Sequence, residues 1–226
     1  MTKEEFQQAQ KDYTKQIEEF REAAHKLHQN VNQTYGDDLP YGFHLDMAVE
    51  SICAYGHLVC VCKDDVLPIF FSGFFHDSIE DARVTYNDVL GMARKWMTEE
   101  QALMATEIVY ALTNDKGRTR AERAGEKYYQ GIRETPYAPF VKLCDRIANI
   151  TYTCSIDSGR NGHRMREVYK GEMSHFLASI NAHSDDPRKQ IPFEAITSLV
   201  EILIEEVDRD EVRRQWGESL RWARQS

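Results

Sequence analysis

Residues 66–81 read VLPIFFSGFFHDSIED, an apolar run that ends abruptly in a charged stretch. We predict a buried helix over Val66 to Phe75, because the run is strongly apolar and follows the polar break Lys63-Asp64-Asp65. A second buried helix is expected before this break, starting at about residue 44. The apolar residues 58–62 also fit a buried strand, since short apolar runs do not distinguish a helix from a strand.

The charged stretch places four ionisable side chains at the end of the apolar helix. His76 and Glu80 are four residues apart, which puts them on one helix face. Asp77 and Asp81 have the same spacing and lie on the adjoining face. A charged residue in an apolar setting needs a partner or a metal ion, so the cluster indicates a functional site. A helix end that simply emerges into solvent would account for the same residues equally well.

Two further segments can supply partners for this cluster. His44 stands at the start of the first apolar helix, directly after Pro40-Tyr41-Gly42-Phe43. The segment 141–149 (VKLCDRIAN) carries four polar residues at i, i+3, i+4 and i+7, on one helix face: Lys142, Asp145, Arg146 and Asn149. Taken alone, an ion cluster of this kind is common on surfaces and contributes little. A lone histidine is likewise more often a hydrogen-bonded residue at a helix end than a metal ligand.

Nearly every other segment reads as helix, so the predicted fold class is all-α. Two helices open with capping boxes, Thr2–Glu5 and Thr98–Gln101. An apolar stripe repeats every seven residues along one long first helix: Phe6, Tyr13, Phe20 and Leu27. This stripe would pack on the core of the chain, with a short coiled coil as the alternative. Residues 118–134 fit a solvated helix or an ordered loop, and further helices are expected over about 138–155, 163–182, 192–206 and 208–224.

Composition limits the possible functions of the chain. Its 226 residues carry a formal charge of −9, and 42% of them are apolar, which fits one domain over residues 1–226. The negative charge argues against nucleic acids and membranes as partners, but not against a small phosphorylated molecule. No apolar run approaches the roughly 20 residues that span a bilayer, and the first residues do not resemble a signal peptide. Five cysteines without disulfide spacing favour a cytoplasmic location.

The order of the candidate residues resembles a known signature. His44, then His76-Asp77, then Asp145 match the H…HD…D pattern of the HD-domain superfamily of metal-dependent phosphohydrolases. The resemblance implies an all-helical bundle with one divalent ion at its centre, held by His44, His76, Asp77 and Asp145. Two imidazoles and two carboxylates suit manganese, iron or zinc, and manganese is the usual expectation in this family. Such an ion lowers the pKa of a bound water and neutralises charge on a phosphoryl group.

In more detail, the chain looks like the hydrolase domain of RelA/SpoT-type enzymes, which the small alarmone hydrolases share. The similarity is carried by HDSIED at 76–81, KLCDRIAN at 142–149, FREAAH at 20–25 and PYGFH at 40–44. Chance rarely supplies all of these motifs in order. The domain core is therefore expected over about 20–182, with a helical extension at either end. The implied reaction removes the 3′-pyrophosphate from guanosine tetra- or pentaphosphate, a nucleotide substrate, and yields GDP or GTP and pyrophosphate.

The same resemblance implies roles for the remaining polar residues. Glu80 and Asp81 match the acidic pair beside the metal, where one would activate water and the other would protonate the leaving oxygen or hold a water. Asn149 matches a position that contacts the nucleotide sugar. Lys142 and Arg146 would steady that helix or the acidic groups. Four basic residues are expected either to bind phosphates or to lie on a solvated face of the chain: Arg118, Arg120, Arg123 and Lys127.

Two departures from the family pattern concern the substrate. The family usually has a basic pair before the Pro-Tyr-x-x-His stretch, whereas residues 33–39 read QTYGDDL, and Leu45 replaces a common proline. An HD phosphohydrolase acting on a nucleoside monophosphate or a cyclic nucleotide is therefore the main alternative. A nucleotide-sensing HD module is another, although it would not need both acids and a full ligand set. A helical scaffold would leave the buried polar groups unexplained.

Overall fold

The computed structural model describes residues 1–36, 38–114, 118–156 and 160–204. Its fold is all-α, as predicted, and the described residues add one two-stranded antiparallel hairpin to the helices. The helix expected over 208–224 lies outside the described residues. No helix among the described residues is both long enough and apolar enough to cross a membrane.

The helices follow one another with short connections. Their bounds are α1 Lys3–Asp12, α2 Thr14–Asn30, α3 Gly42–Tyr55, α4 Val66–Phe75, α5 Ser78–Asp81, α6 Tyr86–Ala93, α7 Glu99–Leu112, α8 Arg120–Arg123, α9 Glu126–Glu134, α10 Ala138–Thr151, α11 Arg160–Ile180 and α12 Phe193–Ile204. The hairpin pairs β1, Thr34–Tyr35, with β2, Leu39–Pro40, and lies between α2 and α3.

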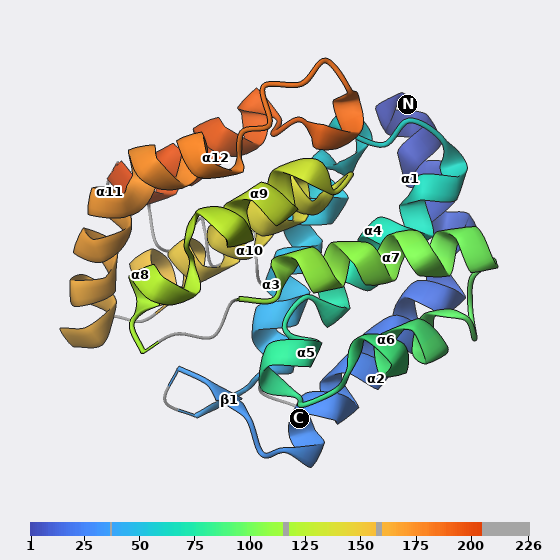
Figure 1. Ribbon diagram of the computed structural model, residues 1–226, viewed down its shortest axis with the longest axis horizontal. Helices are drawn as coiled ribbons and strands as arrows, with labels where there is room; N and C mark the ends of the chain where they lie inside the picture. Colours follow the sequence, from blue (N-terminus) through green and yellow to red (C-terminus); the bar gives the residue numbers. More distant parts are fainter. Residues whose placement is uncertain (37, 115–117, 157–159, 205–226) are drawn as a thin grey trace.

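Helix α10 crosses the middle of the molecule in Figure 1. It packs against α3, α4, α7, α9 and α12, and α4 in turn packs against α2, α3 and α7. Both α3 and α4 are buried along most of their length, and α4 is apolar on nearly every face, with Ser72 as its one polar side chain. Several polar side chains on or next to these three helices are buried, among them His44 on α3, His76 at the end of α4 and Asp145 on α10.

The first helix differs from the sequence prediction. Two helices, α1 and α2, replace the single long helix, and they meet at Tyr13. The predicted stripe still faces the core, since Phe6 and Phe20 are fully buried. Phe20 packs edge-on against Phe71 and Trp96, with ring centroids 5.3 Å from each. The prediction that this segment packs on the chain's own core is thus confirmed, and so is the capping box at Thr2.

The apolar segment before the charged stretch forms two helices, α3 and α4, as predicted. The competing strand over 58–62 is wrong, because a 3₁₀ turn, Gly56–Leu58, leads into irregular chain that pairs with no strand in the described structure. The helical spacing assumed for residues 76–81 is only partly right, because α4 ends at Phe75, Asp77 has non-helical backbone angles (φ −98°, ψ 2°) and a separate short helix, α5, begins at Ser78. Helix α6 was not predicted. Helix α6 carries a readable signal, since Thr85 and Asp88 form a capping box at its start.

Candidate metal centre

Three helices bring one polar side chain each to a common point. His44 lies in the first turn of α3, His76 caps the C-terminus of α4, and Asp145 lies in the middle of α10. The Nε2 atoms of His44 and His76 are 3.1 Å apart. Asp145 Oδ1 lies 3.3 Å from the Nε2 of His44 and 3.7 Å from that of His76. All three residues are buried, and their donor atoms lie within 4.8 Å of one another.

Asp77, the fourth expected ligand, borders the same point. Its Oδ2 lies 3.0 Å from His76 Nε2 and 3.5 Å from His44 Nε2. Its side chain is 20% exposed, compared with 2% for each histidine, so it faces the open side of the cluster. The four residues that the sequence singled out as ligands are thus brought together.

The donor set fits a divalent cation. His76 Nδ1 lies 2.8 Å from the carbonyl oxygen of Gly73, and donation there leaves the lone pair of a neutral ring on Nε2. Two imidazole nitrogens at 3.1 Å need a proton or a cation between them, because two lone pairs repel. Nitrogen and carboxylate oxygen around one point form a mixed set that first-row transition metals accept. The buried cluster of His44, His76 and Asp145 can therefore hold a metal ion.

Charge in the cluster shifts the pKa of every member. Burial lowers the pKa of His44 and His76, but the neighbouring carboxylates outweigh burial, and both pKa values end above the usual one. Burial raises the pKa of Asp145, but the Lys142 ammonium and the two imidazoles outweigh it and hold that pKa well below its usual range. The pKa of Asp77 is lowered in the same way, chiefly by His76. These shifts favour ionised carboxylates and make protons harder to remove from the imidazoles.

We expect a divalent ion to bind more weakly as the pH falls through the raised pKa values of His44 and His76, starting above the usual histidine value of about 6.5. The raised pKa values of His44 and His76 mean that bound protons must leave before both nitrogens can coordinate. Each displaced proton weakens the apparent affinity by about tenfold per pH unit below the raised pKa. Titration calorimetry with Mn²⁺ in buffers of different ionisation enthalpy measures both the affinity and the protons released. An affinity that is independent of pH, with no proton release, would contradict this assignment.

Lys142 and Asn149 both support Asp145. Lys142 Nζ lies 2.9 Å from Asp145 Oδ2, and Asn149 Nδ2 donates to Oδ1 at 2.6 Å. The same amide group also lies 3.0 Å from the backbone carbonyl oxygen of Asp145. Lys142 thus steadies an acidic group, one of the roles that the resemblance implied. Both of these contacts of Asn149 are with Asp145, whereas the resemblance implied a contact with the nucleotide sugar.

A cavity of about 590 Å³ opens beside the cluster. Glu80 and Asp81, the predicted acidic pair, both line it. Asn114 Nδ2 lies 2.8 and 3.1 Å from the two carboxylate oxygens of Glu80, and Arg123 Nη1 lies 3.9 Å from one of them. Asp81 Oδ2 accepts a hydrogen bond of 3.1 Å from the hydroxyl of Tyr41. Both carboxylates are therefore oriented by the protein at the edge of the cluster.

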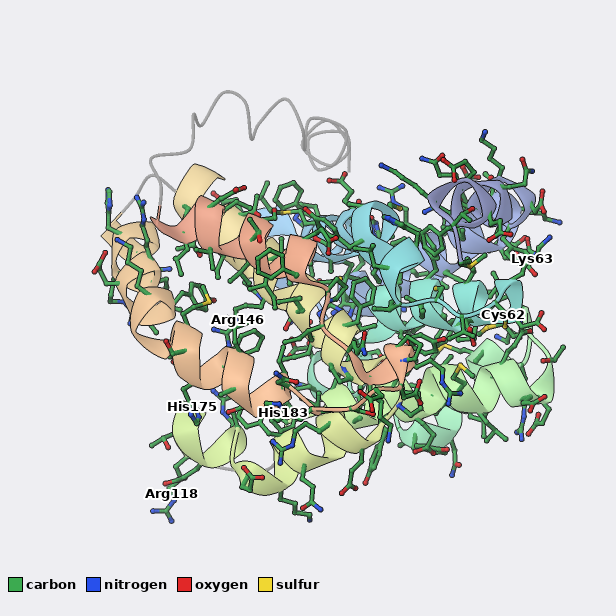
Figure 2. The ribbon with its side chains drawn as sticks, turned by 90° about the horizontal axis from the view of Figure 1, so that it is seen from above. Cys62, Lys63, Arg118, Arg146, His175 and His183 are labelled. Carbon is green, nitrogen blue, oxygen red and sulfur yellow. The ribbon has the colours of Figure 1, made fainter. Side chains whose placement is uncertain are left out.

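Arg146 forms another part of the cavity wall, between α10 and α11. Its guanidinium lies 4.1 Å from the ring centroid of Phe176 and 5.0 Å from that of Tyr169. Its Nη1 donates to Glu172 at 3.2 Å. Figure 2 shows this side chain directed from α10 toward α11, where its three partners are located. The planar cation is held by stacking and by one ion pair, a geometry that lysine could not reproduce.

The predicted basic stretch is only partly at the site. Arg123 lines the cavity, whereas Lys127 is exposed and does not line it. Arg118 is also exposed, and Figure 2 shows it at the periphery of the molecule. The side chain of Arg120 lies outside the described part of the structure. For Lys127, the solvated-face interpretation fits better than a phosphate contact.

Sequence reasoning missed several residues of the site. Tyr35, Asn114 and Glu172 reach the site from segments that carry no local signal, because their contacts depend on how distant helices pack. Tyr41 was noticed only as part of the Pro-Tyr-x-x-His resemblance. Its position three residues before His44, within one helical turn, could have identified it.

Comparison with known proteins adds no assignment. No protein-family model matches the chain, and no curated protein matches it either. The similarity to HD-domain hydrolases therefore rests on the sequence motifs alone. The chemistry of the site has to be argued from its own geometry.

Proposed function

We propose that this protein is a metal-dependent phosphohydrolase that acts on a nucleotide. The observation that carries the proposal is the buried cluster of His44, His76 and Asp145 beside a cavity of about 590 Å³. Cavities of this size suit a molecule as large as a nucleotide. The wall of this cavity combines carboxylates, cations and aromatic rings, which are the groups needed to handle protons, phosphates and a base.

His44, His76 and Asp145, with Asp77 on the open side, would hold one divalent ion. The motif resemblance makes Mn²⁺ the first expectation, and Fe²⁺ or Zn²⁺ fit the same donors. A bound ion of this kind acidifies water and offsets negative charge on a phosphoryl group. Lys142 keeps Asp145 ionised for this task, since its ammonium lies 2.9 Å from Oδ2.

Glu80 and Asp81 are the groups available to move protons. Both carboxylates line the cavity and lie close in sequence to Asp77. One would accept a proton from the attacking water, and the other would return a proton to the leaving oxygen. Asn114 holds the carboxylate of Glu80 in place. Asp81 lies 3.1 Å from the hydroxyl of Tyr41, whose closer partner is Asp77.

The first substrate class that we propose is guanosine tetra- or pentaphosphate. Water would attack the 3′-pyrophosphate group, the bond between phosphorus and the ester oxygen would break, and GDP or GTP and pyrophosphate would leave. The sequence motifs HDSIED and KLCDRIAN support this choice. Arg146 and Arg123 would then lie on the cavity wall to meet the additional phosphates.

The charge of the cavity favours a second candidate, a nucleoside monophosphate. The cations of the described wall are Lys142, Arg146 and Arg123, and each already lies within 4 Å of a carboxylate. The described wall also carries more carboxylates than cations: Asp77, Glu80, Asp81, Asp145 and Glu172. A substrate with one phosphate brings less negative charge into this wall than a tetraphosphate does.

A product assay separates the two substrate classes. The manganese-loaded protein would be offered guanosine tetraphosphate, a series of nucleoside monophosphates and a series of cyclic nucleotides. Pyrophosphate and inorganic phosphate would be measured separately, and nucleotide products would be separated by chromatography, because opening a cyclic phosphodiester yields a nucleoside monophosphate and releases no phosphate. Pyrophosphate with GDP supports the first class, and inorganic phosphate from a monophosphate supports the second. Both activities should vanish in Asp77→Ala and persist in Asp88→Asn, a capping residue of α6. Bound metal without turnover of any compound would contradict the hydrolase and favour a nucleotide sensor.

A further inference from the structure

The hairpin between α2 and α3 carries tyrosines that approach the cluster from two directions. Tyr35 belongs to β1, and Tyr41 directly follows β2. Gly36, in the turn, has φ +61°, and a Cβ there would lie 1.8 Å from the hydroxyl oxygen of Tyr152, just beyond α10. Glycine fits both the left-handed backbone conformation and this close approach, and a larger residue would require the side chain of Tyr152 to move. The hairpin is thus docked against the end of α10, the helix that supplies Asp145.

Tyr41 reaches the carboxylate of Asp77. Its hydroxyl hydrogen-bonds Asp77 Oδ2 and also lies 3.1 Å from Asp81 Oδ2. The ring of Tyr41 stacks on the ring of buried His28, with centroids 4.4 Å apart. His28 Nδ1 in turn lies 2.7 Å from Gln33 Oε1, just before β1. The stacked His28 ring therefore restricts the Tyr41 ring and fixes the direction of its hydroxyl.

Tyr35 reaches the other carboxylate through an amide. Its hydroxyl donates to Asn149 Oδ1 at 2.9 Å, and Asn149 Nδ2 donates to Asp145 Oδ1 at 2.6 Å. Because the oxygen accepts from Tyr35, the amide nitrogen must face Asp145. The ring of Tyr35 also stacks on His44, with centroids 4.8 Å apart. One tyrosine thus contacts one ligand ring directly and orients a second ligand through Asn149.

We propose that Tyr35 and Tyr41 are positioning residues that set the carboxylates of Asp145 and Asp77 for metal binding. The inference rests on the proposed function, because it assigns the outer contacts of that metal site. Partners of metal ligands orient the ligands, and their loss typically costs about 10–100-fold in metal affinity. Their rings contact each other, with centroids 6.1 Å apart, and both pack on His44, so the two effects on affinity should be coupled rather than independent.

The test compares Tyr35→Phe, Tyr41→Phe and the double variant with the wild-type protein. Phenylalanine keeps the stacked rings and removes only the hydroxyl. Each single change should weaken Mn²⁺ binding by about 10-fold or more, and the double change should weaken it at least as much as the larger single effect. Tyr86→Phe is the matched control, because Tyr86 also donates to a carboxylate, Glu107, but in an exposed hydrogen bond between two residues that do not line the cavity. Melting temperatures near that of the wild type would exclude a loss of folding.

Crystal structures of the metal-free variants supply a readout that does not depend on metal. In Tyr35→Phe the Asn149 amide and the Asp145 carboxylate should rotate, and in Tyr41→Phe the Asp77 carboxylate should rotate. Unmoved carboxylates, together with Mn²⁺ affinities equal to that of Tyr86→Phe, would overturn the inference. If the carboxylates rotate in the variants but the wild-type protein binds no Mn²⁺, the positioning role is supported and the proposed function is overturned instead.

Discussion

Replacing Asp145 with asparagine is expected to abolish tight binding of a divalent ion, and with it phosphohydrolase activity. Asp145 supplies the negatively charged oxygen that lies 3.3 and 3.7 Å from the two imidazole nitrogens. Asparagine keeps the size of the side chain but removes the charge that a transition metal needs. The loss of Mn²⁺ affinity should exceed the roughly 10–100-fold that a change in an outer partner costs. Titration calorimetry at fixed pH measures it.

A stability effect has to be separated from this loss. Asp145→Asn leaves the Lys142 ammonium in the interior without its carboxylate, and breaking such a buried pair costs about 3–5 kcal/mol. The double variant Asp145→Asn with Lys142→Met removes the unpaired charge and should recover most of that stability without recovering metal binding. Asp88→Asn, at the start of α6, is the control for replacing a carboxylate with an amide. Near-normal Mn²⁺ affinity in the double variant would contradict the role assigned to Asp145.

Truncating Phe20 to alanine is expected to lower the free energy of unfolding by about 3–5 kcal/mol. Its side chain is fully buried between Phe71 and Trp96, so truncation leaves a cavity among rigid aromatic rings. Urea denaturation followed by circular dichroism measures the change. Phe193→Ala is the matched control, because that ring is 76% exposed and its loss should change stability by less than about 0.5 kcal/mol.

The same urea denaturation distinguishes packing of α1 and α2 on the core of their own chain from a coiled coil between two chains. If Phe20 packs on the core of its own chain, the loss of stability is independent of protein concentration. A short coiled coil between chains would make the midpoint depend on concentration, and Phe20→Ala would remove that dependence. A change below about 1 kcal/mol would contradict the packing in the structure.

The parts of the site that could be predicted lie on single helices. The spacing from Lys142 to Asn149 placed four side chains on one helix face, and the structure places all four on the cavity wall. The apolar run before His76 predicted a buried helix whose end carries a polar pair, and α4 has that form. These predictions worked because periodicity and burial are local properties of a sequence.

The parts that could not be predicted depend on contacts between distant segments. Asn114 holds Glu80 across 34 residues, and Tyr35 holds Asn149 across 114 residues. The break between α1 and α2 at Tyr13 also escaped prediction, because the seven-residue stripe continues through it and gives no breaking signal. The two-residue strands of the hairpin are too short to show any alternation.

The metal centre is tested most directly by anomalous diffraction from a crystal soaked in Mn²⁺. One strong anomalous peak is expected within bonding distance of His44 Nε2, His76 Nε2 and Asp145 Oδ1, with Asp77 as the fourth protein ligand. The peak should be absent in a crystal of Asp145→Asn treated in the same way. A fully soaked wild-type crystal with no peak at this cluster, or with its only peak elsewhere, would contradict the claim that these residues form a metal centre.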